Sequence, residues 1–496
     1  MQPTTKASLA FLIQGAAAQF NITVAASSFV GGTTANSYPP SGSEYSYTQK
    51  NCAHPSSATV NPSLFPSEPV VGFPGPTPTG LEPAAIQTAA IYPYNNGPAN
   101  QFPLVAPHPY GKSEFEDKFN IAKLLGQPLT MMHLLYRHGA RYPTTGAAPS
   151  TFAEKLYNAT HDGGFNVTGE LGFLSDWTYK LGDELLTPFG RSQLFNLGIA
   201  YRQLYGELLN NFTEAGTLPI FRTEFFDVPE YQQQVNIEIL VESPGVNNSG
   251  APYDVCPNSK LASRGSIGNS VASEFAKNAF NSPIARLQTQ IFGVNFTATD
   301  AIAMLQLCSY ETNALGYSTF CTLFSEEDFL AYEYYYDLIF YYNNGPGSPV
   351  SAAQGKGYLQ EWVARLTHTF PSPTSALNEI FDNTTTFFPL NNSIYTDATH
   401  EVVVLDTLTA FNLTALFKGL PLDPTGNQHN NVFVASKQVP FATHFTTQVL
   451  ECPAYTPTRQ ICFIVNDAVV PIAESYSGCS EDPNGLCSLD TVISVL

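Results

Sequence analysis

One stretch of the chain limits the fold more than any other. Residues 129 to 136 are largely apolar and predict a buried strand. This strand delivers Arg137, His138, Gly139 and Arg141 into a loop, because Pro143 then prevents regular strand pairing. Charged and nucleophilic side chains are therefore expected at the end of a buried strand.

The two arginines and the histidine form a candidate site for an oxyanion. An arginine fork can grip two oxygens of a phosphate at once, which the point charge of a lysine cannot. The histidine between them can act as a nucleophile, and Gly139 allows the backbone to approach a ligand closely. The alternative is a surface turn with a chance cluster of charges. The chain holds only 21 lysines and arginines among 496 residues, which argues against chance.

Residues 137–143, RHGARYP, resemble the RHGxRxP signature of the histidine acid phosphatases. This is the branch of the histidine phosphatase superfamily that includes the fungal phytases. The resemblance implies that His138 accepts the phosphoryl group as a covalent phosphohistidine, while Arg137 and Arg141 bind the phosphate. It extends over roughly residues 119 to 488. The implied fold is α/β, a phosphoglycerate-mutase-like mixed sheet flanked by helices, with a mostly α-helical insert domain that caps the pocket.

The segment Thr399-His400-Glu401 resembles the second half of the family's site. The usual family motif is His-Asp, in which the histidine contacts the phosphate and the aspartate protonates the leaving alcohol. The resemblance therefore implies that His400 is a catalytic and phosphate-binding residue and that Glu401 is the proton donor. A glutamate can serve as the general acid, and it adds one methylene of reach.

Arg222, in the segment PIFRT, is the candidate for a third phosphate ligand, because a similar arginine ends a strand in the family. The family usually continues with a helix of about four turns. Here the next expected strand, residues 235–240, follows within about a dozen residues. The shortened segment is either natural or an error in the gene model.

Several elements can be predicted around these motifs. Thr187 and Pro188 predict the start of a helix, and Ser325 with Asp328 predicts a capping box for a helix through Tyr342. A further helix is expected at 358–366, and strands are expected near 129, 219, 235 and 461–470 and before His400. Propensity favours a strand for the valines at 402–404, but the family resemblance favours a helix, which we adopt.

The expected domain organisation has five parts: a signal peptide (1–18), a Pro/Ser/Gly-rich N-terminal arm (19–118), a first α/β catalytic part (119–244), a mainly helical insert (245–389) and a second α/β catalytic part (390–496).

Three features predict a secreted glycoprotein. The N-terminus has a basic residue, a short apolar run and an Ala-Ala-Ala cleavage pattern. The eight cysteines suit an oxidising compartment. N-linked glycans are expected at the sequons Asn21, Asn158, Asn166, Asn211, Asn247, Asn295, Asn383, Asn391 and Asn412.

The resemblance implies disulfides between Cys308 and Cys321 and between Cys479 and Cys487. The pairing of the other four cysteines stays open. Cys452 and Cys462 could pair locally, and Cys256 could pair with Cys52.

The predicted function is that of a secreted acid phosphatase for phosphate monoesters. The net charge of −20 argues against a nucleic-acid partner, no apolar run predicts a membrane span, and neither a metal nor another cofactor is expected.

Phytase is the second interpretation. Some phytases carry lysines around the pocket, whereas here the loop after the signature holds only Lys155 and residues 337–342 contain no lysine. A phosphoglycerate mutase-like enzyme would be cytosolic, which the secretion signals oppose. A catalytically inactive binding protein is the non-enzyme alternative, supported by the short segment after Arg222, the His-Glu variant and the early C-terminus.

Overall fold

The computed structural model describes residues 129–496 except for 224–234, 374–376, 379, 420, 427–432 and 483, and except for the side chain of Gln203. The predicted signal peptide and N-terminal arm, the sequon at Asn21, Cys52 and the segment that follows Arg222 lie outside the described residues. No helix among the described residues is long and apolar enough to cross a membrane.

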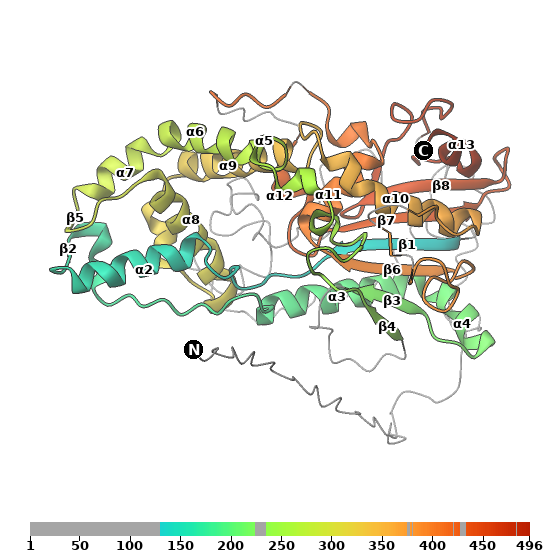
Figure 1. Ribbon diagram of the computed structural model, residues 1–496, viewed down its shortest axis with the longest axis horizontal. Coiled ribbons are helices and arrows are strands. Elements are labelled where there is room, and N and C mark those ends of the chain that lie inside the picture. The colour runs from blue at the N-terminus through green and yellow to red at the C-terminus, as the bar shows by residue number, and fades with distance from the viewer. Residues whose placement is uncertain are drawn as a thin grey trace, which may run out of the picture.

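A mixed sheet forms one side of the molecule, on the right of Figure 1. Its strand order is β10-β8-β7-β1-β6-β3-β4, with β9 attached to β8. Strands β1, β6, β3 and β4 are neighbours in this order and pair in parallel. Strands β7, β8, β9 and β10 are joined to the sheet in antiparallel pairs. The strands are β1 (Leu129–Arg137), β3 (Ile220–Thr223), β4 (Asn236–Ile239), β6 (Ile394–Thr399), β7 (His444–Glu451), β8 (Arg459–Val465), β9 (Ala468–Val470) and β10 (Cys487–Ser488).

Helices cover both faces of this sheet. Successive side chains of a strand point to opposite faces. Met132 and Leu134 of β1 pack in one cluster with Tyr205, at the end of α3 (Pro188–Tyr205). Leu135 lies in the main core cluster with Leu408 of α11 (Glu401–Ala410), and α11 packs on α10 (Ser351–Thr367). Strand β1 is therefore buried on both sides, as its apolar sequence predicts.

A second group of helices projects beyond the sheet, on the left of Figure 1. In this group α2 packs on α8, and α6 packs on α9. A short two-stranded sheet, β2 (Asn166–Val167) with β5 (Ile291–Phe292), closes its far end. The helices of the group are α2 (Ala148–His161), α5 (Ala262–Gly265), α6 (Ile267–Ala279), α7 (Asn281–Gln288), α8 (Ala298–Leu315) and α9 (Glu326–Asn343). The other α-helices of the described residues are α4 (Asn210–Ala215), α12 (Ala435–Gln438) and α13 (Leu489–Val495).

The predicted helix starts are confirmed. The side-chain oxygen of Thr187 accepts a hydrogen bond from the Gly190 N–H at the start of α3. Ser325 and Asp328 form the predicted capping box of α9. The valines that follow Glu401 are helical, in α11, as the family resemblance implies.

The prediction of a single strand at 461–470 is wrong. The chain reverses at Asn466 and Asp467, both of which have positive φ angles, so that β8 and β9 form an antiparallel hairpin. Asparagine and aspartate tolerate this left-handed conformation better than most residues.

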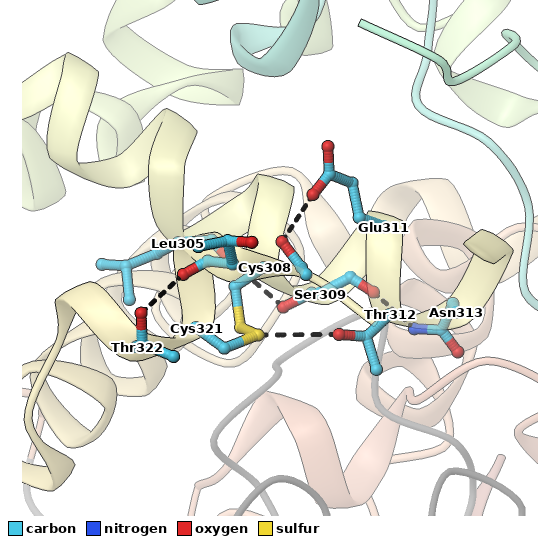
Figure 2. The surroundings of a disulfide bond; sticks show 10 residues. Leu305, Cys308, Ser309, Glu311, Thr312, Asn313, Cys321 and Thr322 are labelled. Carbon is cyan, nitrogen blue, oxygen red and sulfur yellow. Dashed lines mark hydrogen bonds between the residues drawn. A yellow bond between two sulfur atoms is a disulfide. The ribbon is translucent and has the colours of Figure 1, made fainter. Parts of the chain in front are cut away.

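Both implied disulfides are present. Figure 2 shows the Cys308–Cys321 bond, which joins α8 to the 3-10 helix η7 (Thr319–Leu323). The second bond joins Cys479 and Cys487.

The structure contradicts both pairings suggested for the remaining cysteines. Cys256 and Cys462 are free thiols. Cys462 therefore does not bridge to Cys452, and Cys256 does not bridge to Cys52.

Candidate active site

The parallel pair β1 and β6 brings two distant segments to one edge of the sheet. Arg137, the last residue of β1, lies opposite Thr399, the last residue of β6. The backbone N–H of His138 then donates to the carbonyl oxygen of Thr399 at 3.3 Å. His138 and His400 therefore leave the sheet side by side, with ring centroids 5.6 Å apart in an edge-on arrangement.

The hydrogen bond of His138 selects one tautomer of its ring. Nδ1 lies 2.8 Å from the carbonyl oxygen of Gly139, and a carbonyl can only accept, so Nδ1 carries the hydrogen. Burial lowers the pKa of His138 well below its usual range, and Arg137 lowers it further. The ring is therefore neutral in the free protein, and Nε2 keeps the lone pair that a nucleophile needs.

Arg137 and Glu401 form an ion pair next to this nitrogen. Arg137 Nε lies 3.0 Å from Glu401 Oε2, and the same carboxylate oxygen is 4.0 Å from His138 Nε2. Arg137 is fixed by donating from Nη1 to the Val439 carbonyl at 2.7 Å and by stacking over Phe441. Burial alone would raise the pKa of Glu401, but Arg137 and the neighbouring cationic groups outweigh burial and lower that pKa to about 2.

Arg141 lies at the more open rim of the site. Its guanidinium forms an ion pair with Glu184 at 3.1 Å and donates to the Thr144 hydroxyl at 2.9 Å. Its charge also contributes to the lowered pKa values of His138 and Glu401. The site thus has a buried arginine at its base and a second one at its rim.

Two glycines let α3 approach the His138 loop. A Cβ placed on Gly139 would lie 2.2 Å from the Gly190 carbonyl oxygen, and one on Gly190 would lie 1.8 Å from the Ala140 carbonyl oxygen. The N–H of Thr187 also donates to Ala140 at 2.9 Å. The start of α3 therefore supports the loop from behind.

Arg222 is not brought into the cluster. It lies on β3 opposite Asp397, deeper in the sheet than the two histidines. Its Nη1 contacts Glu361 at 2.8 Å, its Nη2 contacts Asp382 at 3.0 Å, and its Nε lies 3.8 Å from Glu238. Three carboxylates already engage this guanidinium, so its contacts do not support the predicted role as a third phosphate ligand.

The sequence reasoning missed three residues that lie around the site. Glu242 is 3.3 Å from His400 Nε2, and Glu184 pairs with Arg141. Burial raises the pKa of the Tyr310 phenol on α8, and the positive charges of the two site arginines oppose this rise. Tyr310 therefore lies near the site. Glu184 and Glu242 belong to no motif, so no local pattern marks them.

The donor atoms of His138, His400 and Glu401 lie within 4.8 Å of one another, a spacing that could also hold a metal ion. However, Arg137 contacts the same carboxylate, and Arg141 lies at the rim. Positive charges beside the three side chains favour an anion over a cation.

Comparison with known families agrees with this geometry. A family described as the histidine phosphatase superfamily (branch 2) matches residues 128–225 and 228–466. The chain is 28% identical over 397 residues to Phytase A of Aspergillus awamori, covering 74% of this chain and 82% of that protein. It is also 28% identical over 402 residues to Phytase A of Aspergillus oryzae, with the same coverage.

Solved structures show the same fold. The phytase from D. castellii superposes with a TM-score of 0.62 at 22% identity, covering 79% of this chain and 84% of that one. The apo multiple inositol polyphosphate phosphatase of Bifidobacterium longum superposes with a TM-score of 0.55 at 12% identity, covering 79% and 96%.

Proposed function

Because this chain belongs to branch 2 of the histidine phosphatase superfamily, we propose that it is a secreted acid phosphatase that hydrolyses phosphate monoesters through a phosphohistidine. One observation carries the proposal. The unprotonated Nε2 of His138 lies between Arg137, His400 and a carboxylate that can serve as an acid, 4.0 Å away.

The first chemical step is a transfer of the phosphoryl group. The lone pair of His138 Nε2 attacks phosphorus, and the bond from phosphorus to the ester oxygen breaks. Glu401 gives its proton to that oxygen, so that a neutral alcohol leaves. Arg137, Arg141 and His400 hold the non-bridging oxygens and stabilise the charge on the transferring group.

The second step restores the enzyme. Glu401, now a carboxylate, takes a proton from water as the water oxygen attacks phosphorus. The P–N bond breaks, and its electron pair returns to His138. Phosphate leaves, and Glu401 is protonated again for the next cycle.

Glu401 must change its surroundings when the substrate binds. A separation of 4.0 Å from His138 Nε2 leaves no room for a phosphoryl group between the two, so the glutamate side chain has to swing outward. Arg137 can then transfer its contact from the carboxylate to the phosphate. The added negative charge raises the pKa of Glu401 from its low value in the free protein.

The substrate itself can supply the missing proton. The second pKa of a phosphate monoester is about 6. In mild acid most substrate therefore arrives as a monoanion that still carries one proton. This source explains how a carboxyl group with a low pKa can act as a general acid.

Phytate is the second candidate substrate, because relatives named Phytase A match most of the chain. The surroundings of the site favour a less charged ester. Lys155 is bound to Asp300 at 2.7 Å, and the acids Glu184 and Glu242 lie near the rim. We therefore keep simple monoesters first and phytate second.

Secretion and glycosylation form part of the proposal. The described structure leaves most sequon asparagines exposed. Asn247 is the exception, because it is half-buried and its amide donates to the Leu377 carbonyl at 3.1 Å. We expect glycans at Asn158, Asn166, Asn211, Asn295, Asn383, Asn391 and Asn412.

Trapping the intermediate tests the mechanism against the binding-protein alternative. The protein is mixed with an aryl phosphate, denatured rapidly, and its intact mass is measured. A phosphoryl adduct that disappears in His138→Ala supports the proposal. A protein that binds phosphate but never acquires the adduct would instead be a binding protein of this fold.

A further inference from the structure

A carboxylate outside every recognised motif contacts one of the proposed catalytic residues. Glu242 lies just after β4, and its side chain is 37% exposed. Its Oε2 is 3.3 Å from His400 Nε2. The contact joins a loop from the middle of the chain to the N-cap residue of α11.

The same carboxylate is held from its other side. The hydroxyl of Tyr253, in the short 3-10 helix η5 (Pro252–Asp254), donates to Glu242 Oε1 at 2.6 Å. The intervening loop is tied to β6, because the Thr399 hydroxyl donates to the Gly250 carbonyl at 2.8 Å. One oxygen of Glu242 is therefore anchored while the other faces His400.

This arrangement determines which atoms of His400 carry hydrogen. A carboxylate accepts but does not donate, so Nε2 donates its hydrogen to Glu242. The hydrogen bond from His400 is the main cause that lowers the pKa of Glu242, to about 2. Glu242 is therefore charged throughout mild acid.

The ring of His400 is therefore held by two neighbours, because Nε2 contacts Glu242 at 3.3 Å and the ring lies edge-on to His138 with the centroids 5.6 Å apart. These two contacts fix the orientation of the ring beside the proposed nucleophile.

We propose that Glu242, anchored by Tyr253, is a positioning residue that keeps the His400 ring oriented for its contact with the bound phosphate. This role rests on the proposed phosphatase function. Glu242 acts through His400 and needs no contact with the substrate.

If Glu242 acted only through its negative charge, its removal would change the phosphate affinity in the opposite direction. A negative charge near an anion site weakens anion binding, so that removing it should tighten binding. If Glu242 positions His400, removing its charge should weaken binding although the repulsion is gone. The sign of the change therefore separates the two explanations.

The test measures kcat and KM for an aryl phosphate, and calorimetric binding of inorganic phosphate, in mild acid. The variants are Glu242→Gln, Tyr253→Phe and the double variant, with Glu474→Gln as the control. Glu474 is an exposed carboxylate that pairs with Lys418, away from the site.

We expect Glu242→Gln to lower kcat/KM and phosphate affinity by about tenfold, the value of one charged hydrogen bond. Tyr253→Phe should lower both by less, about threefold, because this variant loses only the anchor of Glu242 and keeps its charge beside His400. The double variant should be no worse than Glu242→Gln alone, because both act through one contact.

Unchanged or tighter phosphate binding in Glu242→Gln would overturn the proposal, and so would additive losses in the double variant. If Glu242→Gln does not fold, a Tyr253→Phe variant with unchanged binding overturns it equally. Phosphate binding needs no turnover. A wild-type protein that binds phosphate in a Glu242-dependent way but hydrolyses no ester would contradict the phosphatase function and leave the positioning role intact.

Discussion

Glu401 pairs with Arg137 in the free protein, yet the proposed reaction requires it to carry a proton. The contact at 3.0 Å and the pKa of about 2 describe the protein without substrate. A bound phosphate would take over Arg137 and add negative charge. The longer side chain of glutamate then has to carry its proton to an oxygen on the far side of the phosphorus.

Replacing this acid should affect esters according to their leaving groups. Glu401→Gln should slow first-turnover release of an alkyl alcohol by about 10²- to 10⁴-fold, the usual contribution of general acid catalysis. Release of nitrophenolate, which leaves without a proton, should slow by less than about tenfold. Rapid-quench measurements of both esters test this.

Glu401→Asp serves as the matched control, because it keeps the acid and shortens it by one methylene. Alkyl ester cleavage by this variant should stay within about tenfold of wild type. Equal losses for both esters in Glu401→Gln would show that Glu401 is not the proton donor.

Single residues show where sequence reasoning succeeds. Arg137, His138, His400 and Glu401 lie in two short motifs, and parallel pairing of β1 with β6 brings the motifs together. Arg222 also lies near the end of a strand, but its surroundings are set by carboxylates far away in sequence. Such partners leave no local pattern, so its place could not be predicted.

At the level of elements, the start of α3 and the His138 loop depend on a very close backbone approach. A side chain on Gly190 would overlap the Ala140 carbonyl, while one on Gly198 in the same helix would meet nothing within 4 Å. The two positions form a natural pair for comparison.

We expect Gly190→Ala to destabilise the protein by about 1–3 kcal/mol, as in other overpacked sites, and to lower kcat by displacing the loop. Gly198→Ala should be neutral or stabilising by up to about 1 kcal/mol, because alanine favours a helix interior. Denaturant unfolding and steady-state kinetics measure both. An equally stable and active Gly190→Ala variant would contradict the packing argument.

Elements also show why some boundaries were missed. The predicted helix at 358–366 in fact begins at Ser351 and includes Gly355. A Cβ on Gly355 would lie 2.1 Å from the Asp406 carbonyl oxygen, so this glycine allows α10 to pack against α11. A glycine normally weakens a helix, and its packing role is invisible until the partner is known.

At the scale of the whole molecule, buried charges link the sheet to the surrounding helices. Arg222 on β3 meets Glu361 from α10, and Arg365 binds Asp397 on β6 with both nitrogens. Glu238 lies beside this network, 3.8 Å from Arg222. Burial raises the pKa of Glu238 to about 7 despite Arg222.

This raised pKa predicts a preference for acid. The folded protein holds the Glu238 proton more tightly than the unfolded chain, whose glutamates titrate near about 4.3. The contribution of Glu238 to the free energy of unfolding is therefore fully present below that pH and is lost as the pH rises through about 7.

In Glu238→Gln this loss should vanish, so the fall in Tm between about pH 4.5 and pH 7.5 should be smaller than in wild type. Glu274→Gln, at an exposed surface position, should retain the wild-type slope. Thermal unfolding across this pH range measures the difference. Identical slopes for wild type and Glu238→Gln would contradict the assignment.

The overall fold could be predicted mainly through resemblance. Length and periodicity predict individual helices and the central strand, but not the strand order, which depends on pairing between segments such as β1 and β7 that lie far apart in sequence. The β8–β9 hairpin was missed because its turn, Asn466-Asp467, is short and lies inside one apolar run.

The central claim is that His138 is the nucleophile of a phosphatase. The most direct measurement is phosphate release in mild acid from an aryl phosphate and from phytate, by wild type, His138→Ala and the control His161→Ala. His161 is an exposed histidine at the end of α2. We predict release from the aryl ester by wild type and by His161→Ala and none by His138→Ala, with release from phytate identifying a phytase. No release by wild type from either ester, or undiminished release by His138→Ala, would contradict the account.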